Sequence, residues 1–122
     1  MITEDYISFE TAKLLKEKGF DEYCYGYYYT SKYMTHGDIK QRNSELFPDS
    51  YSAPTLQMAM KWLREVHNIH IEIGIGYNME YFPVCISTQT NEPIPYIAMR
   101  GKPFTYEKAC EVAIKYCLEN LI

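Results

Sequence analysis

Residues 69–77 read IHIEIGIGY, in which isoleucine or tyrosine occupies every second position. Successive side chains of a β-strand point to opposite faces, so this period of two places every isoleucine on one face. The opposite face carries His70, Glu72 and two glycines. The stretch therefore predicts a strand with one buried face.

The residues just before this strand predict an amphipathic helix that ends near His67-Asn68. Residues 53–55 (APT) provide its start, and apolar side chains then recur at three- and four-residue steps. Trp62 falls at the margin of the apolar stripe, where it either widens the buried face or anchors an interface, and we expect burial. The stripe consists of Leu56, Ala59, Met60, Leu63 and Val66.

The residues after the strand predict a hairpin partner and a last helix. Residues 81–88 alternate so that Phe82, Val84 and Ile86 share a face, with Pro83 in an edge position or at a bulge. Residues 94–99 predict a third strand. Thr105 is a suitable N-cap for a helix that runs almost to the C-terminus. The apolar stripe of that helix is Ala109, Val112, Ala113, Tyr116 and Cys117.

The N-terminal half contains weaker signals. Ser8 as an N-cap and Gly19 as a stop predict a helix over residues 9–18. Residues 23–30 predict a tyrosine-rich strand. Gly37-Asp38 predicts a hairpin turn flanked by Tyr33-Met34 and residues 39–41, followed by a polar loop through residues 48–50.

These elements predict an α+β fold. We expect residues 1–122 to form a single domain, in which three amphipathic helices pack mainly on one face of an antiparallel sheet of four to five strands. Hydrophobic residues make up 47% of the chain and charged residues 23%, which is the composition of a folded globular protein.

The charge and the cysteine content limit the classes of protein to which this chain can belong. The net charge of −4 is spread along the chain, which argues against a duplex-binding surface. No apolar run is long enough to span a bilayer, and Glu4 and Asp5 stand where a signal peptide would carry lysines. Four cysteines without the density of a secreted scaffold predict reduced thiols. We expect a cytoplasmic protein with no membrane partner.

The tyrosines are the strongest candidates for function, because six of the thirteen fall between Tyr23 and Tyr33. On a strand, four of them would project from one face at intervals of roughly 6.6 Å. They would pack under a helix, form a protein interface, or stack on bases or sugars. The candidate binding residues are Tyr25, Tyr27, Tyr29, Tyr33 and Trp62, and in the nucleic-acid alternative Lys32, Lys40 and Arg42 contact phosphate.

Two catalytic alternatives have weaker support. His67 and His70 invite a metal site, but one follows a helix and the other begins a strand, so a third ligand would have to come from elsewhere. In the thiol alternative, Cys24 or Cys85 would pair with His36, His67 or His70, although no spacing selects a pair. Cys110 and Cys117 are expected to be core residues of the last helix, too far apart along it to bridge. The sequence predicts no catalytic residue, metal or cofactor.

Three blocks of sequence carry a resemblance. Residues 2–10 (ITEDYISFE), residues 53–65 and residues 106–118 resemble a family of small uncharacterised proteins from gut anaerobic bacteria and their temperate phages. Residues 23–50 match this family less well. The resemblance implies a cytoplasmic, phage-associated accessory protein and transfers no catalytic residue.

The sequence therefore predicts a non-enzymatic interaction module that engages another protein or a second copy of itself as a homodimer. The alternatives are a single-stranded nucleic-acid binder that uses the tyrosine-rich strand, and a metal-dependent or thiol hydrolase.

Overall fold

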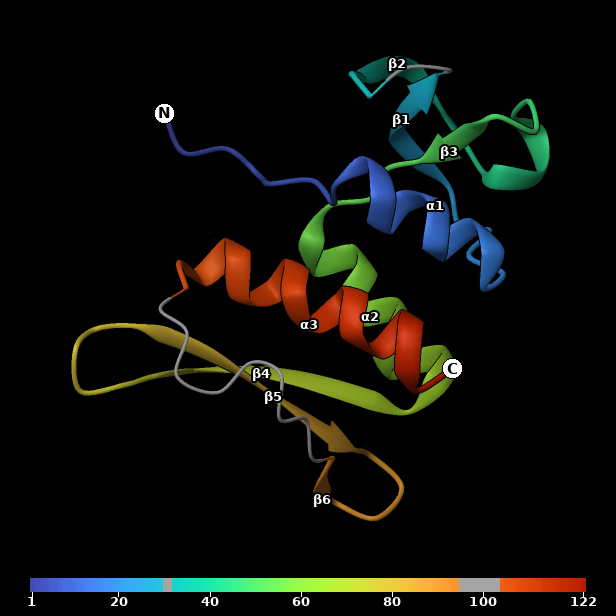
Figure 1. Ribbon diagram of the computed structural model, residues 1–122. Coiled ribbons are helices and arrows are strands. Elements are labelled where there is room, and N and C mark those ends of the chain that lie inside the picture. Colours follow the sequence, from blue (N-terminus) through green and yellow to red (C-terminus); the bar gives the residue numbers. More distant parts are fainter. Residues whose placement is uncertain (30–31, 95–103) are drawn as a thin grey trace.

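The computed structural model describes residues 1–29, 32–94 and 104–122. Within these residues, three α-helices lie between two antiparallel sheets of three strands each (Figure 1). The expectation of one sheet of four to five strands, covered mainly on one face, is therefore wrong in this respect, whereas the α+β class is confirmed. The sequence signals identify the strands but do not say which of them pair.

The first sheet has the strand order β2-β1-β3, with β1 (Cys24–Tyr29) in the middle. β2 (Met34–Gln41) and β3 (Ser50–Ser52) both pair with it in antiparallel fashion. Residues 48–50 were expected to be a polar loop, but β3 begins at Ser50. Ser52 is buried there, and its backbone N–H donates a hydrogen bond to the side chain of Asn43.

The predicted hairpin turn at Gly37-Asp38 is wrong. Both residues lie inside β2, and the chain reverses between Tyr29 and Met34 instead. The pairing changes from Cys24 with Gln41 to Gly26 with His36, so β2 contains additional residues and bulges at this point. The turn-forming residues Gly37-Asp38 accommodate that bulge.

The second sheet has the order β4-β5-β6, formed by β4 (Ile69–Ile75), β5 (Tyr81–Ser87) and β6 (Glu92–Ile94). β4 and β5 match their predicted positions. Of the predicted third strand, residues 95–99 lie outside the described residues. β6 pairs only with the Cys85–Ser87 part of β5, so Pro83 has β4 as its one ladder neighbour in the part of the chain that the structure describes.

The inward face of β5 is the one opposite Phe82, Val84 and Ile86. Pro83 and Cys85 are buried, whereas Phe82 is exposed and Val84 and Ile86 are only half-buried. Phe82 pairs with Gly74, and its ring covers the space that a side chain at Gly74 would need. The side chains of β5 do alternate between the two faces of the sheet. The buried face is the one that packs against the helices, whatever the size of its side chains.

The three helices follow their predicted caps. α1 (Phe9–Glu17), α2 (Leu56–His67) and α3 (Tyr106–Asn120) begin after Ser8, Thr55 and Thr105. Each of these side chains accepts a hydrogen bond from the backbone N–H three residues later, which satisfies a free donor of the first turn. Val66 was expected on the buried stripe of α2 but is exposed, because it lies at the rim of a surface hollow that Trp62 also lines.

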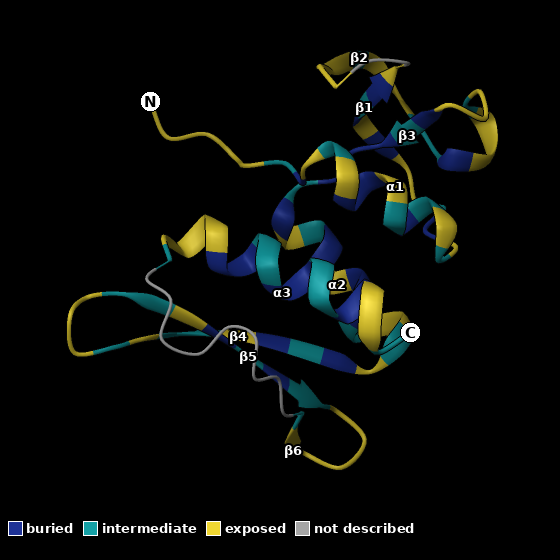
Figure 2. Ribbon diagram, in the orientation of Figure 1, coloured by how far each residue is buried: buried dark blue, intermediate teal, exposed yellow. Residues whose placement is uncertain are grey.

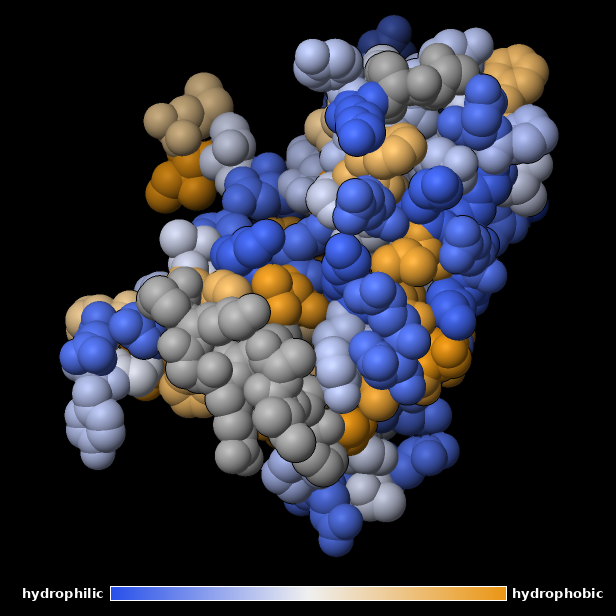
Figure 3. All heavy atoms as spheres, in the orientation of Figure 1, coloured by the Kyte–Doolittle hydropathy of each residue, from blue (hydrophilic) through white to orange (hydrophobic). Residues whose placement is uncertain are grey.

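The helices and sheets share one core. α3 contacts α1, α2, β4 and β5, and α1 contacts β3, so the buried cluster reaches from the first sheet to the second. Buried residues follow α2, α3 and the beginning of β4, whereas β2 and the tip of the β4–β5 hairpin are exposed (Figure 2). In the face shown in Figure 3, hydrophobic side chains gather over α3, and the surface over the first sheet is mostly hydrophilic.

Candidate functional site

The tyrosine-rich strand exposes its tyrosines. Cys24, Gly26 and Tyr28 face the interior of the protein, and the alternate positions of β1 face outward. Tyr25 and Tyr29 are 43% and 49% exposed, whereas Tyr27 is half-buried. The alternative in which the stripe packs under a helix is therefore wrong for these residues. Tyr23, just before β1, is 48% exposed, and we call Tyr23, Tyr25, Tyr27 and Tyr29 the tyrosine face.

Charged and aromatic neighbours hold two of these rings in place. The His36 ring stacks on Tyr25 at a centroid distance of 5.5 Å and an interplanar angle of 17°. Lys40 Nζ lies 5.3 Å from the centre of the same Tyr25 ring. A cation over an aromatic face is attracted by the ring quadrupole, typically by about 0.5–1 kcal/mol at an exposed site. Tyr25 is therefore exposed, but both a stacked ring and a cation contact it.

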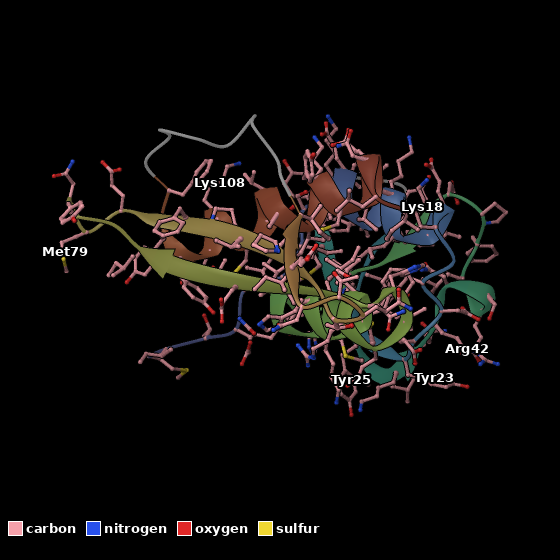
Figure 4. All side chains as sticks on the ribbon, turned by 90° about the horizontal axis from the view of Figure 1, so that it is seen from below. Lys18, Tyr23, Tyr25, Arg42, Met79 and Lys108 are labelled. Atoms are coloured by element: carbon pink, nitrogen blue, oxygen red, sulfur yellow. The ribbon has the colours of Figure 1, made fainter. Side chains whose placement is uncertain are left out.

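Tyr23 has a similar support. The guanidinium carbon of Arg42 lies 5.1 Å from the centre of the Tyr23 ring. Asp21 and Glu45 lie 3.9 and 4.0 Å from Arg42 Nε, so the guanidinium is flanked by two carboxylates, although neither forms a hydrogen bond with Nε. Figure 4 shows Tyr23 and Tyr25 pointing outward on one side of the molecule, with Lys18 and Lys108 on the other side.

A hollow of about 140 Å³ lies beside these two rings. Tyr6, Pro54 and Met58 form much of its wall, together with Tyr23, Tyr25 and Lys40. Met58 also lines a second hollow of about 250 Å³, so the two hollows adjoin along α2. Both are below the roughly 300–1,000 Å³ of a typical small-molecule pocket. Their size suits single side chains better than a cofactor.

The remaining binding candidates lie at different places. Trp62 is only 6% exposed and packs edge-on against Phe20, so the expected burial is confirmed, although the Trp62 side chain also lines the second hollow. Lys32 and Tyr33 are exposed just before β2, close to the Tyr29 end of the face because Tyr28 pairs with Met34. Lys40 and Arg42 lie at its other end. The structure thus brings together Tyr25, Lys40 and Arg42, but not Lys32.

His67 and His70, the two candidate metal ligands, have separate surroundings. His67 packs edge-on against Trp62 at a centroid distance of 4.7 Å, and His70 Nε2 lies 4.0 Å from Glu72 Oε1. Within residues 1–29, 32–94 and 104–122, no three histidine, cysteine or carboxylate side chains are grouped closely enough to hold a metal ion. The metal alternative gains no support from these residues.

The four cysteines are buried and free. Burial raises the pKa of the Cys24 thiol to about 11, and burial likewise raises the pKa of Cys110 to about 11. A thiol nucleophile requires the opposite shift, because the thiolate is the reactive form. Cys24 and Cys110 therefore have the environment of core residues.

Sequence reasoning missed Tyr6, His36 and Met58. Tyr6 lies on the N-terminal segment, whose backbone pairs with the residues before α2, and its ring contacts His36 edge-on at 6.1 Å. Met58 is on the side of α2 away from the apolar stripe. No local sequence pattern marks these residues, because they reach the tyrosine face only through tertiary contacts.

Comparisons with protein-family models, with curated proteins and with solved structures return no match. In the described part of the chain, no helix has the length and apolar character needed to cross a bilayer. The fold and the site define a small α+β protein with an exposed aromatic face, whose rings contact basic side chains and a histidine.

Proposed function

We propose that this protein is a non-enzymatic, cytoplasmic interaction module that holds a segment of another protein against the tyrosine face. The observation that carries the proposal is the support of the exposed Tyr23 and Tyr25 rings by Arg42, Lys40 and His36. Aromatic rings that are already fixed lose little conformational entropy on binding, and tyrosine is enriched among the residues that dominate interface energies. The buried free thiols are consistent with a reducing compartment.

The hollow beside the rings favours a peptide segment as the occupant. Its volume of about 140 Å³ suits one aliphatic or small aromatic side chain, and Met58, Pro54 and Tyr6 offer that side chain an apolar wall. Tyrosine hydroxyls around the rim can pair with the backbone of the segment. A partner segment with one apolar anchor residue fits this arrangement.

Charge argues against the single-stranded nucleic-acid alternative. Residues 21–45 carry three basic side chains, Lys32, Lys40 and Arg42, but four carboxylates, Asp21, Glu22, Asp38 and Glu45. Two of these carboxylates already pair with Arg42. Phosphate binding depends on a net basic surface, so the same rings are better suited to a protein partner.

A displayed random-peptide library selected on the wild-type protein tests the proposal. We expect enriched peptides whose affinity, measured by fluorescence anisotropy, falls at least tenfold in Tyr23→Ser and Tyr25→Ser variants. Tyr77→Ser is the matched control, because Tyr77 is fully exposed but lies beyond β4 in the second sheet. Failure to enrich any peptide, or equal losses in the Tyr77 variant, would overturn the proposal. Tight binding of a labelled oligonucleotide at low salt would favour the nucleic-acid alternative instead.

A further inference from the structure

Two of the buried cysteines form a pair that the tyrosine face does not use. Cys85 on β5 and Cys117 on α3 place their Sγ atoms 3.7 Å apart, in the core between the helix layer and the second sheet. Both residues have 0% of their surface exposed. Cys110 provides a natural comparison, because it is equally buried on the same helix and no thiol contact is found for it among the described residues.

We propose that Cys85 and Cys117 are a modification site at which a small peroxide forms a reversible disulfide between α3 and β5. The inference goes beyond the proposed binding function and does not depend on it. A buried cysteine is normally inert, but a second thiol in contact changes both its reactivity and the fate of its oxidised form.

The S–H···S contact provides a nucleophile. The hydrogen bond between the two thiols, in which either sulfur can be the donor, lowers the pKa of the Cys85 thiol, although burial acts in the opposite direction. The same contact, together with burial, raises the pKa of Cys117 far above its usual range. One thiol of the pair can therefore ionise while the other keeps its proton as the hydrogen-bond donor, and we take Cys85 as the thiolate in the proposed reaction.

The chemistry balances with peroxide as the only oxidant. The Cys85 thiolate attacks one peroxide oxygen, the O–O bond breaks, and the released hydroxide takes up the proton lost by Cys85 to give water. Cys85 is then a sulfenic acid. The Cys117 sulfur attacks the Cys85 sulfur, the S–O bond breaks, and the oxygen leaves as a second water with the Cys117 proton. Two thiols are oxidised to one disulfide, and one peroxide is reduced to two waters.

The geometry favours the second step over further oxidation. A disulfide bond is about 2.05 Å long, so the two sulfurs must approach by about 1.6 Å from their separation of 3.7 Å. Because Cys117 is already in contact, it can capture the sulfenic acid before a second peroxide reaches it. Because both thiols are fully buried, the size of the oxidant decides whether it can reach them. Hydrogen peroxide is close to water in size, whereas oxidised glutathione can reach the thiols only if the core opens.

The experiment treats the folded protein with hydrogen peroxide or with oxidised glutathione, then unfolds it and alkylates the free thiols. With peroxide we expect two of the four thiols to become unavailable, a peptide pair linked through Cys85 and Cys117, and complete recovery with dithiothreitol. The oxidised protein should melt about 12–16 °C higher, because the cross-link restricts the unfolded chain. Oxidised glutathione should react at least tenfold more slowly.

Variants separate the pair from the other thiols. Cys110→Ala should keep the linked peptides, and Cys85→Ala and Cys117→Ala should lose them. The wild-type peptide map alone remains decisive if a core variant does not fold. Four alkylatable thiols after peroxide, a link that involves Cys110, or equal rates with glutathione would overturn the proposal.

Discussion

The Asn43 side chain links the segment that follows α1 to β3 of the first sheet. Its replacement is the most informative test of the fold. Asn43 is 4% exposed, and its Nδ2 donates to the Phe20 carbonyl oxygen at 2.7 Å. Its Oδ1 accepts from the Ser52 N–H at 2.8 Å. One amide thus joins the end of the α1 region to β3, and both backbone partners are themselves buried.

The size of the effect follows from these two bonds. Asn43→Ala removes both and leaves a buried N–H and a buried carbonyl without partners. A buried polar group that loses its partner costs about 1–3 kcal/mol, so we expect a loss of about 3 kcal/mol in the free energy of unfolding. Asn43→Asp keeps the acceptor for Ser52 but places a carboxylate against the Phe20 carbonyl oxygen. Protonation restores a donor, so its deficit should be smaller at pH 4 than at pH 7.

Urea unfolding followed by circular dichroism measures these differences. Asn120→Ala is the matched control, because its Nδ2 donates to one backbone carbonyl at an exposed position and the change should cost less than about 0.5 kcal/mol. If Asn43→Ala unfolds within about 0.5 kcal/mol of Asn120→Ala, the buried amide does not hold the first sheet as described.

Three further changes test other parts of the structure. Gly26→Ala should lower the free energy of unfolding in urea by about 2 kcal/mol, because the added Cβ would lie 2.8 Å from the backbone oxygen of Ala53. Gly74→Ala should lower it by less than about 1 kcal/mol, because the partly exposed Phe82 ring can move aside. Tyr28→Phe should lose about 1–2 kcal/mol, because the hydroxyl donates to the buried Ile7 carbonyl at 2.7 Å, and an unchanged midpoint would contradict this. Burial raises the pKa of Cys24 and Cys110 to about 11, so the folded chain keeps protons that the unfolded chain releases near its ordinary thiol pKa. These two thiols should therefore lower the free energy of unfolding between about pH 9 and pH 11 and contribute no pH dependence below about pH 8, so a Cys24→Ala/Cys110→Ala variant should show a flatter alkaline profile.

The helices and the second sheet could be predicted because their signals are local. Ser8 and Thr105 cap their helices as expected, α2 begins directly after the predicted start at residues 53–55, and the alternating isoleucines define β4. The first sheet could not be predicted equally well. Gly37-Asp38 has the composition of a turn, and only the pairing of β2 with β1 shows that it accommodates a bulge instead.

The candidate site was predictable only in part for the same reason. Alternation identifies the tyrosines that share a face, but not whether that face is covered. The outcome depends on the opposite positions of β1: Tyr28 is buried and hydrogen-bonded to the N-terminal segment, and Gly26 lets that segment and Ala53 approach closely. Because these two residues commit one face of β1 to the interior, the other tyrosines remain outside.

The proposed disulfide and the tyrosine face belong to different sheets, and this separation leads to a final prediction. Linking Cys85 to Cys117 closes a loop with a sequence separation of 32 residues, which should stabilise the fold by about 3–4 kcal/mol through the unfolded state. The cross-link joins α3 to β5, whereas Tyr23 and Tyr25 are supported by residues of β2 and its flank. Peroxide treatment should therefore raise the melting temperature but leave the affinity for a selected peptide unchanged within twofold. A larger change in affinity, absent from the Cys85→Ala variant, would mean that the contact of α1 with α3 transmits strain from one sheet to the other.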